Sequence, residues 1–314
     1  MRQYRTLVVI LNWQQPALTE ACVHAVQALK TPGVDILLVD NGSTDGSVAY
    51  LTETFPGIQL IALPENRGFA VGANAGLQHA LQAGFDYALL LNNDAFPAPD
   101  MLDRLLAAAS EDVALLSPKI YYDDARNVIW FAGARQHKRL LEMRDSGLNA
   151  PDSAAWNETR DVDYVLGTGL LVNLGAVRVV GWLDERFFMY YEDLDWSIRL
   201  REAGFRLRLV ADAHLFHRVS TSSGGLDSPM QKYHLARSSV IFFRRHARKG
   251  TPALIILYRA ASAIRTVTRL IFTGKTRSAK AYLRGLVDGW RVTAQPANGG
   301  ALANKGSRVT FGEK

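Results

Sequence analysis

The sequence has very few cysteines: among its 314 residues Cys22 is the only one. This scarcity excludes an intramolecular disulfide and makes a reducing compartment the simpler expectation. Cys22 lies in a stretch with helical spacing, and we predict that it is a core residue. With 48% hydrophobic residues, the chain can bury a full core as one large domain or as one domain with an appendage.

Long apolar runs are also missing. The first run, residues 7–11, is too short for a signal peptide and predicts a strand. A membrane-spanning helix needs roughly 18 to 20 apolar residues. The closest candidate, residues 253–272, contains Arg259, Arg265 and Arg269, which are costly at the centre of a bilayer. We therefore expect no transmembrane helix.

Acidic residues are scarce in the C-terminal part. From residue 232 onward there are 17 Lys and Arg against two acids, whereas residues 1–231 hold 19 basic and 28 acidic residues. The split predicts a main domain at 1–231, a basic helical region at 232–294 and, because hydrophobicity is low there, a disordered tail at 295–314. Such a basic region suits an anionic surface, either nucleic acid or the cytoplasmic leaflet of a membrane.

The first hundred residues alternate short apolar runs with longer helical patterns. The predicted strands are 7–11, 35–39, 59–63 and 87–91, and the predicted helices are 16–29, 47–55 and 72–83. This order is typical of an α/β fold whose mainly parallel sheet is covered by helices on both faces. Ligands of such sheets bind at the carboxyl ends of the strands.

The rest of the chain is less regular. We expect further strands at 120–122 and 162–172 and a polar surface loop at 145–159. Helices are expected at 192–203, 233–248 and 254–270.

Polar motifs follow the first three predicted strands. After the first, Asn12 opens the segment 12–16, where a dinucleotide fingerprint would have glycines. After the second, Asp40 and Asn41 precede a Gly-Ser-Thr-Asp turn. A carboxylate at a strand end can accept a hydrogen bond from a nucleotide base, but the segment can also serve only as a turn and helix cap.

The segment that follows the third strand, residues 66–76, is rich in small residues that let a backbone approach a ligand. It begins with Asn66, Arg67 and Gly68 and includes Asn74. Arg67 or the helix N-terminus near Gly72 could contact a phosphate.

Two motifs suggest a cation site. Asn92, Asn93 and Asp94 end the most hydrophobic strand, where they could hold a divalent cation or form an Asx turn. His217 precedes a basic residue and a Ser/Gly loop. A lone histidine is more often structural, but His217 could complete a metal or diphosphate site with Asp94.

The aromatic segment 187–191 leads into three acids at a helix start. The helix dipole favours acids there by only about 0.3 to 1 kcal/mol. Asp195 lies four residues before Arg199, so we assign it a structural role. Asp193 receives the chemical role, because a carboxylate beside aromatic walls suits a general base.

Taken in chain order, the motifs at 39–47, 66–76, 92–94, 187–196 and 214–225 resemble glycosyltransferase family 2, and within it the rhamnosyltransferase-like enzymes that build bacterial surface polysaccharides. The resemblance spans about residues 6–245 and implies a GT-A fold, a Rossmann-like α/β sheet, here followed by basic C-terminal helices. It also implies that Asp193 is the catalytic base and that Asp94 and His217 bind Mg²⁺ or Mn²⁺. The implied donor-binding residues are Asn12, Asp40, Asn41, Asn66, Arg67, Gly68, Asn74 and Asn93.

Within the resemblance, the acid that matches Asp40 reads the pyrimidine base. The family's usual metal motif is Asp-x-Asp, whereas residues 92–94 of this chain supply one carboxylate. We therefore expect most of the cation's affinity to come from the donor diphosphate.

The function implied is inverting transfer of a sugar, rhamnose from a thymidine-diphosphate donor in the first instance, to a saccharide or lipid-linked glycan acceptor. A uridine-diphosphate hexose is the alternative donor. A nucleotidyltransferase would need a Gly-rich triphosphate loop where residues 12–16 lie, and a catalytically silent nucleotide-sugar-binding subunit would not need Asp94, Asp193 and His217 together.

The implied partners and location follow from these acceptors. We expect no nucleic-acid partner and a cytoplasmic protein, peripheral at the inner face of the plasma membrane. The spacing of apolar and basic residues in 258–272 predicts a helix. This helix either lies at a membrane interface or packs on the main domain with a solvated basic face.

Overall fold

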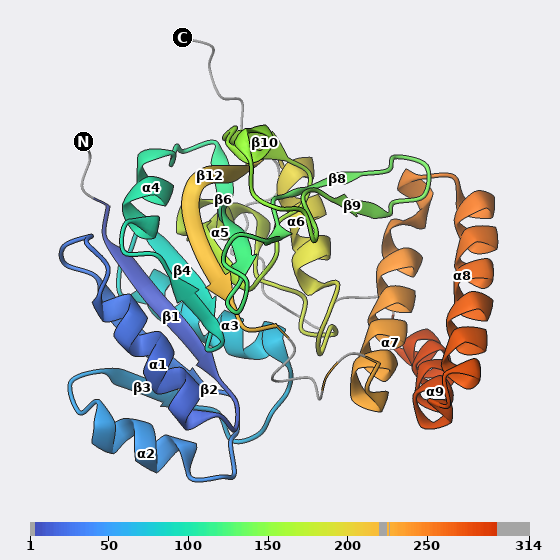
Figure 1. Ribbon diagram of the computed structural model, residues 1–314, viewed down its shortest axis with the longest axis horizontal. Coiled ribbons are helices and arrows are strands. Elements are labelled where there is room, and N and C mark those ends of the chain that lie inside the picture. The colour runs from blue at the N-terminus through green and yellow to red at the C-terminus, as the bar shows by residue number, and fades with distance from the viewer. Residues whose placement is uncertain (1–3, 220–224, 226, 294–314) are drawn as a thin grey trace.

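The first hundred residues fold as their pattern predicts. The computed structural model describes residues 4–219, 225 and 227–293. Strands and helices alternate along the chain (Figure 1). The strands are β1 (Thr6–Asn12), β2 (Asp35–Asp40), β3 (Gln59–Ala62) and β4 (Tyr87–Asn92). The helices are α1 (Pro16–Gln27), α2 (Ser47–Thr54) and α3 (Phe69–Gln82).

These strands form the parallel half of a ten-stranded sheet. Its order is β10-β12-β6-β11-β4-β1-β2-β3, with β5 (Ala95–Pro97) paired to β12 and β7 (Ile129–Phe131) paired to β6. The β1/β2, β1/β4 and β2/β3 pairs are parallel, so the carboxyl ends of these strands share one edge. The predicted α/β class with a mainly parallel sheet is confirmed.

The prediction of a single strand at 162–172 is wrong. The chain forms β10 (Arg160–Val162) and β11 (Gly169–Asn173), which pair with different neighbours in the sheet. Residues 163–168 leave the sheet between them, because Tyr164 and Gly167 donate hydrogen bonds to Asp193. The predicted strand at 120–122 is the end of the longer β6 (Val113–Tyr122).

The loop expected at 145–159 begins at the end of β9 (Met143–Asp145), which pairs with β8 (Ala134–Gln136), and contains the short η1 (Ala154–Trp156). The twelve-residue β12 (Arg206–His217) was not predicted, although apolar residues alternate in part of it. It carries His217 to the edge of the sheet. The remaining helices of this part are α4 (Met101–Ala107), α5 (Leu174–Val180) and α6 (Glu192–Glu202).

Three C-terminal helices pack together beside the sheet (Figure 1). They are α7 (Pro229–His246), α8 (Pro252–Phe272) and α9 (Thr276–Arg291), with the turn η2 (Ala247–Lys249) after α7. Glycines allow α9 to approach α7 closely, because a Cβ on Gly285 would lie 2.3 Å from the Tyr233 carbonyl oxygen. No helix of the described residues is long and apolar enough to cross a membrane. The tail predicted to be disordered, 295–314, lies outside the described residues.

Helix α7 is joined to α6 by a buried ionic cluster centred on Asp195. One Asp195 oxygen is 2.8 Å from Nε2 of His246, and the other accepts a 2.8 Å hydrogen bond from Arg199; Arg245 lies within 3.2 Å of the carboxylate. Burial alone would raise the pKa of Asp195, but the His246 hydrogen bond and the two arginine charges lower it to about 2. The cluster therefore fixes the start of α6, which carries Asp193, against the C-terminal helices.

Candidate active site

A cleft of about 480 Å³ lies at the carboxyl ends of β1 and β4. Its walls come from segments far apart in the sequence: the two strand ends, the loop before α3, the start of α6 and the end of β12. The predicted site residues that line it are Asn12, Asn41, Asn66, Gly68, Asn93, Asp94, Asp193 and His217. The structure thus brings together eight residues that span more than two hundred positions.

A chain of hydrogen bonds fixes the polar groups at the strand ends. Asn12 donates through Nδ2 to Asp40 at 2.6 Å and accepts through Oδ1 from the Thr19 hydroxyl, also at 2.6 Å. Asn93 in turn donates to the Thr19 hydroxyl oxygen at 3.0 Å. Asn12 and Asn93 are therefore held in defined orientations at the floor of the cleft.

The wall before α3 depends on Asn41, Asn66 and Gly68. Nδ2 of Asn41 donates to Oδ1 of Asn66 and to the Gly68 carbonyl oxygen. Gly68 has a φ of +101°, and a Cβ there would lie 2.2 Å from the carbonyl oxygen of Phe188. Glycine is required at this position because the loop crosses directly over the segment that leads to Glu192 and Asp193.

Three predicted donor-binding residues do not line the cleft. Asp40 lies beneath it, where its two oxygens accept hydrogen bonds from Asn12 and from the Ser43 N–H. Arg67 is exposed on the loop before α3. Asn74 is buried, and its amide is engaged with the backbone of Leu183, to which it both donates and from which it accepts. Asn74 thus connects α3 to a distant segment instead of facing the donor.

Asp94 and His217 meet across the cleft. Nε2 of His217 is 3.1 Å from Oδ1 of Asp94, and both side chains are buried. The pairing of β12 with β5 places His217 opposite Ala95, next to Asp94. Trp130 covers the histidine ring with its own ring centroid 4.4 Å away. Nδ1 of His217 is buried and makes no hydrogen bond.

Asp193 lines the same cleft, at the start of α6. Its Oδ2 accepts hydrogen bonds from the Tyr164 hydroxyl at 3.0 Å and the Gly167 N–H at 3.1 Å, and Oδ1 accepts from the Leu194 N–H at 2.8 Å. Burial raises the pKa of Asp193, while these hydrogen bonds to its ionised form limit the rise. A buried carboxylate with a raised pKa suits a general base.

Glu192, which the sequence analysis did not single out, is a second acid of the cleft. It is buried, and its Oε2 has no hydrogen-bond partner. Burial and the charge of Asp193 raise the pKa of Glu192 well above its ordinary value. Two adjacent buried acids cannot easily both ionise. Because Asp193 has three hydrogen-bond donors, we infer that it keeps the charge and that Glu192 keeps the proton.

Comparison with known families gives this geometry a context. Residues 7–157 match Glycosyl transferase family 2, and residues 87–284 match Glycosyl transferase family group 2. The chain belongs to the family 2 glycosyltransferases.

Three curated relatives are named as rhamnosyltransferases. The chain is 28% identical over 82% of its length to N-acetylglucosaminyl-diphospho-decaprenol L-rhamnosyltransferase of Mycobacterium tuberculosis, covering 89% of that protein. It is 20% identical over 85% of its length to the dTDP-rhamnosyl transferase RfbF of Shigella flexneri, covering 89% of it. Rhamnosyltransferase WbbL of Escherichia coli is 29% identical over 52% of this chain and 62% of its own length.

Solved structures of glycosyltransferases share the fold. The mannosyltransferase PcManGT from Pyrobaculum calidifontis, in complex with GDP-Man and Mn²⁺, aligns with a TM-score of 0.57 at 17% identity over 92% of this chain and 88% of its own. GalNAc-T7 with UDP, GalNAc and Mn²⁺ also aligns at 0.57, with 14% identity over 78% of this chain and 51% of its own. The GT-A fold expected from the sequence is confirmed.

Substitutions of the two cleft acids, Asp193 and Glu192, should affect catalysis differently. Asp193→Asn should lower kcat by about 100 to 10,000-fold, the usual contribution of a general base. Glu192→Gln should stay within about threefold of the parent, because glutamine resembles the protonated acid that we infer at this position. Initial rates of sugar transfer, with circular dichroism to verify folding, measure both effects.

The pH profile separates the two acids further. Since the pKa of Asp193 is raised, kcat/KM should fall with decreasing pH already above the ordinary aspartate value of 3.8, and Glu192→Gln should retain this acid limb. An acid limb that disappears in Glu192→Gln would assign the base to Glu192 instead.

Proposed function

We propose that this family member is an inverting, metal-dependent rhamnosyltransferase that transfers sugar from a nucleoside-diphosphate donor to a lipid-linked saccharide. The observation that carries the proposal is that one cleft holds two kinds of group: Asp193 on α6, and Asp94 with His217 at the ends of β4 and β12. The names of the curated relatives support rhamnose as the sugar and a diphosphate-linked lipid as the acceptor carrier. A thymidine-diphosphate donor is our preferred choice.

Asp94 and His217 suit a divalent cation only when other ligands join them. Among the described residues, no three His, Cys, Asp or Glu side chains gather to hold a metal. Six ligands are usual for Mg²⁺, and it commonly keeps waters and binds substrate phosphates. Asp94 and His217 would therefore hold the cation together with the donor diphosphate. Bound there, Mg²⁺ or Mn²⁺ would neutralise charge on the departing nucleoside diphosphate.

The chain's own residues would perform the rest of the reaction. Asn12, Asn41, Asn66, Gly68 and Asn93 line the donor half of the cleft, with Asp40 acting through Asn12 and Arg67 at the rim. Asp193 would take the proton from the acceptor hydroxyl as its oxygen attacks the anomeric carbon. The protonated Glu192 beside it adds no second negative charge to the cleft. Positioning of the two substrates supplies much of the acceleration.

The metal prediction concerns Asp94. Asp94→Asn should lower kcat/KM more than about 100-fold, because loss of a direct ligand should exceed the 10 to 100-fold effect typical of groups that only support ligands. Asp124→Asn is the matched control, since Asp124 is exposed. A thermal-shift titration with thymidine- and uridine-diphosphate sugars, with and without Mn²⁺ or Mg²⁺, measures donor binding directly.

In the parent protein a donor should raise the melting temperature only when the cation is present. In Asp94→Asn the donor and the cation together should no longer raise the melting temperature. Stabilisation by a uridine-diphosphate hexose alone would overturn the thymidine-diphosphate assignment. No stabilisation by any donor would overturn the proposed function. Binding without measurable transfer would indicate the catalytically silent subunit.

We further propose that α8 and α9 rest on an anionic membrane surface. Their outer sides expose large apolar residues, which we call the apolar surface: Leu254, Ile256, Leu257, Ile264, Ile271 and Phe272 on α8, and Leu283, Val287 and Trp290 on α9. Exposed basic residues flank the apolar residues of α9: Arg277, Lys280, Arg284 and Arg291. An apolar strip beside basic side chains matches the interface between acyl chains and anionic head groups.

Membrane contact predicts a defined mutational effect. Ile264→Glu places a charge on the apolar surface, where the side chain is 68% exposed, and should reduce flotation with anionic vesicles at low salt by at least about fivefold. Val179→Glu makes the same change at an exposed valine of α5 and should float like the parent. A parent protein that stays unbound, or equal flotation of both variants, would contradict membrane contact through this surface.

A further inference from the structure

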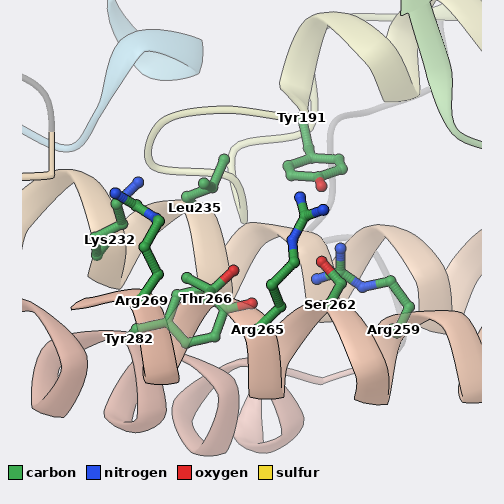
Figure 2. Close-up of a pocket in the computed structure, with 9 residues that line it drawn as sticks. All are labelled: Tyr191, Lys232, Leu235, Arg259, Ser262, Arg265, Thr266, Arg269 and Tyr282. Atoms are coloured by element: carbon green, nitrogen blue, oxygen red, sulfur yellow. The ribbon is translucent and has the colours of Figure 1, made fainter. Parts of the chain in front are cut away.

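A second cavity, of about 430 Å³, lies between α7, α8, α9 and Tyr191, the residue that precedes Glu192 and Asp193 (Figure 2). Its walls are strongly basic. Its lining includes Tyr191 from the segment before α6, Lys232 from α7, Arg259, Arg265 and Arg269 from α8, and Tyr282 from α9. Four of these six are cations, so the cavity is suited to an anion.

One buried carboxylate accounts for only part of this positive charge. Asp227 accepts two hydrogen bonds from Arg269, at 2.7 and 2.8 Å, and lies 2.8 Å from Nζ of Lys232 and 2.9 Å from that of Lys275. The hydrogen bonds from these cations, led by Arg269, hold the pKa of Asp227 far below its ordinary value. Lys232 and Arg269, which line this end of the cavity, together exceed the charge of Asp227 by one, and Lys275 adds a further positive charge outside the lining.

At the other end, Arg259 and Arg265 add two more charges. Arg259 donates to the Ser239 hydroxyl at 2.6 Å and stacks over the Phe243 ring. Arg265 rises from α8 toward Tyr191 (Figure 2). In the part of the chain that the structure describes, neither arginine has an ion-pair partner. Arg259 is fixed by its contacts, whereas Arg265 is available to a ligand.

The basic cavity adjoins the segment that leads into Glu192 and Asp193. Tyr190, Glu192 and Asp193 line the active cleft, whereas Tyr191 between them lines the basic cavity. Tyr190 and Tyr191 both have positive φ angles, 67° and 70°, and this unusual backbone turns neighbouring side chains to opposite sides. A molecule bound in the cavity would therefore lie close to the general base, on the side of the C-terminal helices.

The cavity also adjoins the apolar surface. On α8, Arg265 follows the exposed Ile264 directly and lies between the apolar side of the helix and the residues that face α7. A lipid whose chain lay against α8 and α9 would have its head group beside Arg265. The same geometry places basic groups where a phosphate at the membrane surface would be found.

We propose that this basic cavity binds a lipid-borne phosphate group, and that its occupant during catalysis is the diphosphate of the lipid-linked acceptor. The second part rests on the proposed function, because it requires the acceptor sugar to reach Asp193 while its diphosphate is held on the other side of Tyr191. The anchor would position the acceptor hydroxyl without taking part in the chemistry.

The test uses the full chain and compares Arg265→Gln with Arg178→Gln, which removes the same charge from an exposed position on α5, outside the apolar surface and its flanking basic residues. Binding is measured by co-sedimentation with phosphatidylcholine vesicles that carry a few mole percent of polyprenyl diphosphate, and in parallel with phosphatidylglycerol in its place. Arg265→Gln should weaken binding to the polyprenyl-diphosphate vesicles about tenfold, the effect of one charge-assisted hydrogen bond. Arg178→Gln should stay within about twofold.

Each outcome decides the proposal. Equal effects of the two variants would overturn the phosphate site. An equal loss on both kinds of vesicle for Arg265→Gln would show a general head-group site and overturn the assignment to the acceptor. Inorganic pyrophosphate should compete with the polyprenyl-diphosphate vesicles in the parent protein and lose this effect in Arg265→Gln; competition that is unchanged in the variant would contradict the site.

Transfer kinetics separate this proposal from the proposed function. With a lipid-linked acceptor, Arg265→Gln should raise KM about tenfold, and with a soluble saccharide that lacks phosphate it should match the parent. A parent protein that transfers no sugar but shows Arg265-dependent lipid binding would overturn the function and remove the acceptor as occupant. A parent that transfers sugar while Arg265→Gln and Arg178→Gln behave alike would overturn only the cavity.

Discussion

Asp195 is completely buried and still ionised, because His246, Arg199 and Arg245 surround its carboxylate. Removing one partner of such a buried cluster commonly costs about 3 to 5 kcal/mol. Two of these partners come from α7, so the C-terminal helices and the start of α6 are held as a unit. That unit places Glu192 and Asp193 at the cleft and the basic cavity behind them.

The half of the cleft that we propose binds the donor and the half that we propose binds the acceptor are built in different ways. The donor half rests on parallel strand ends, where Asn12, Thr19 and Asn93 are joined by hydrogen bonds. The acceptor half is built on α6 and on the segment that Gly68 contacts. The first half uses backbone fixed by the sheet, and the second depends on contacts between distant parts of the chain. Substrate differences between relatives are therefore expected in the second half.

Much of this was predictable from the sequence, because strand ends can be located from apolar runs and polar motifs follow them. The order of motifs placed Asp94, Asp193 and His217 in one site before any contact was known. The sequence predicts Asn74 at the donor site, whereas its side chain bonds Leu183. The pattern cannot show this contact, because Leu183 is 109 residues away. The role of Glu192 was missed because its burial arises from packing. The basic cavity forms only when α7, α8 and α9 pack together.

In the proposed reaction Asp193 acts as a base in a single displacement, and Glu192, beside it, never attacks the sugar. The anomeric configuration of the product tests this most directly. It can be read from the one-bond carbon–hydrogen coupling at C1 by NMR, using a donor of known configuration. A single displacement at the anomeric carbon predicts a product of inverted configuration. A retained configuration would show a covalent glycosyl intermediate or a front-side reaction and would contradict it.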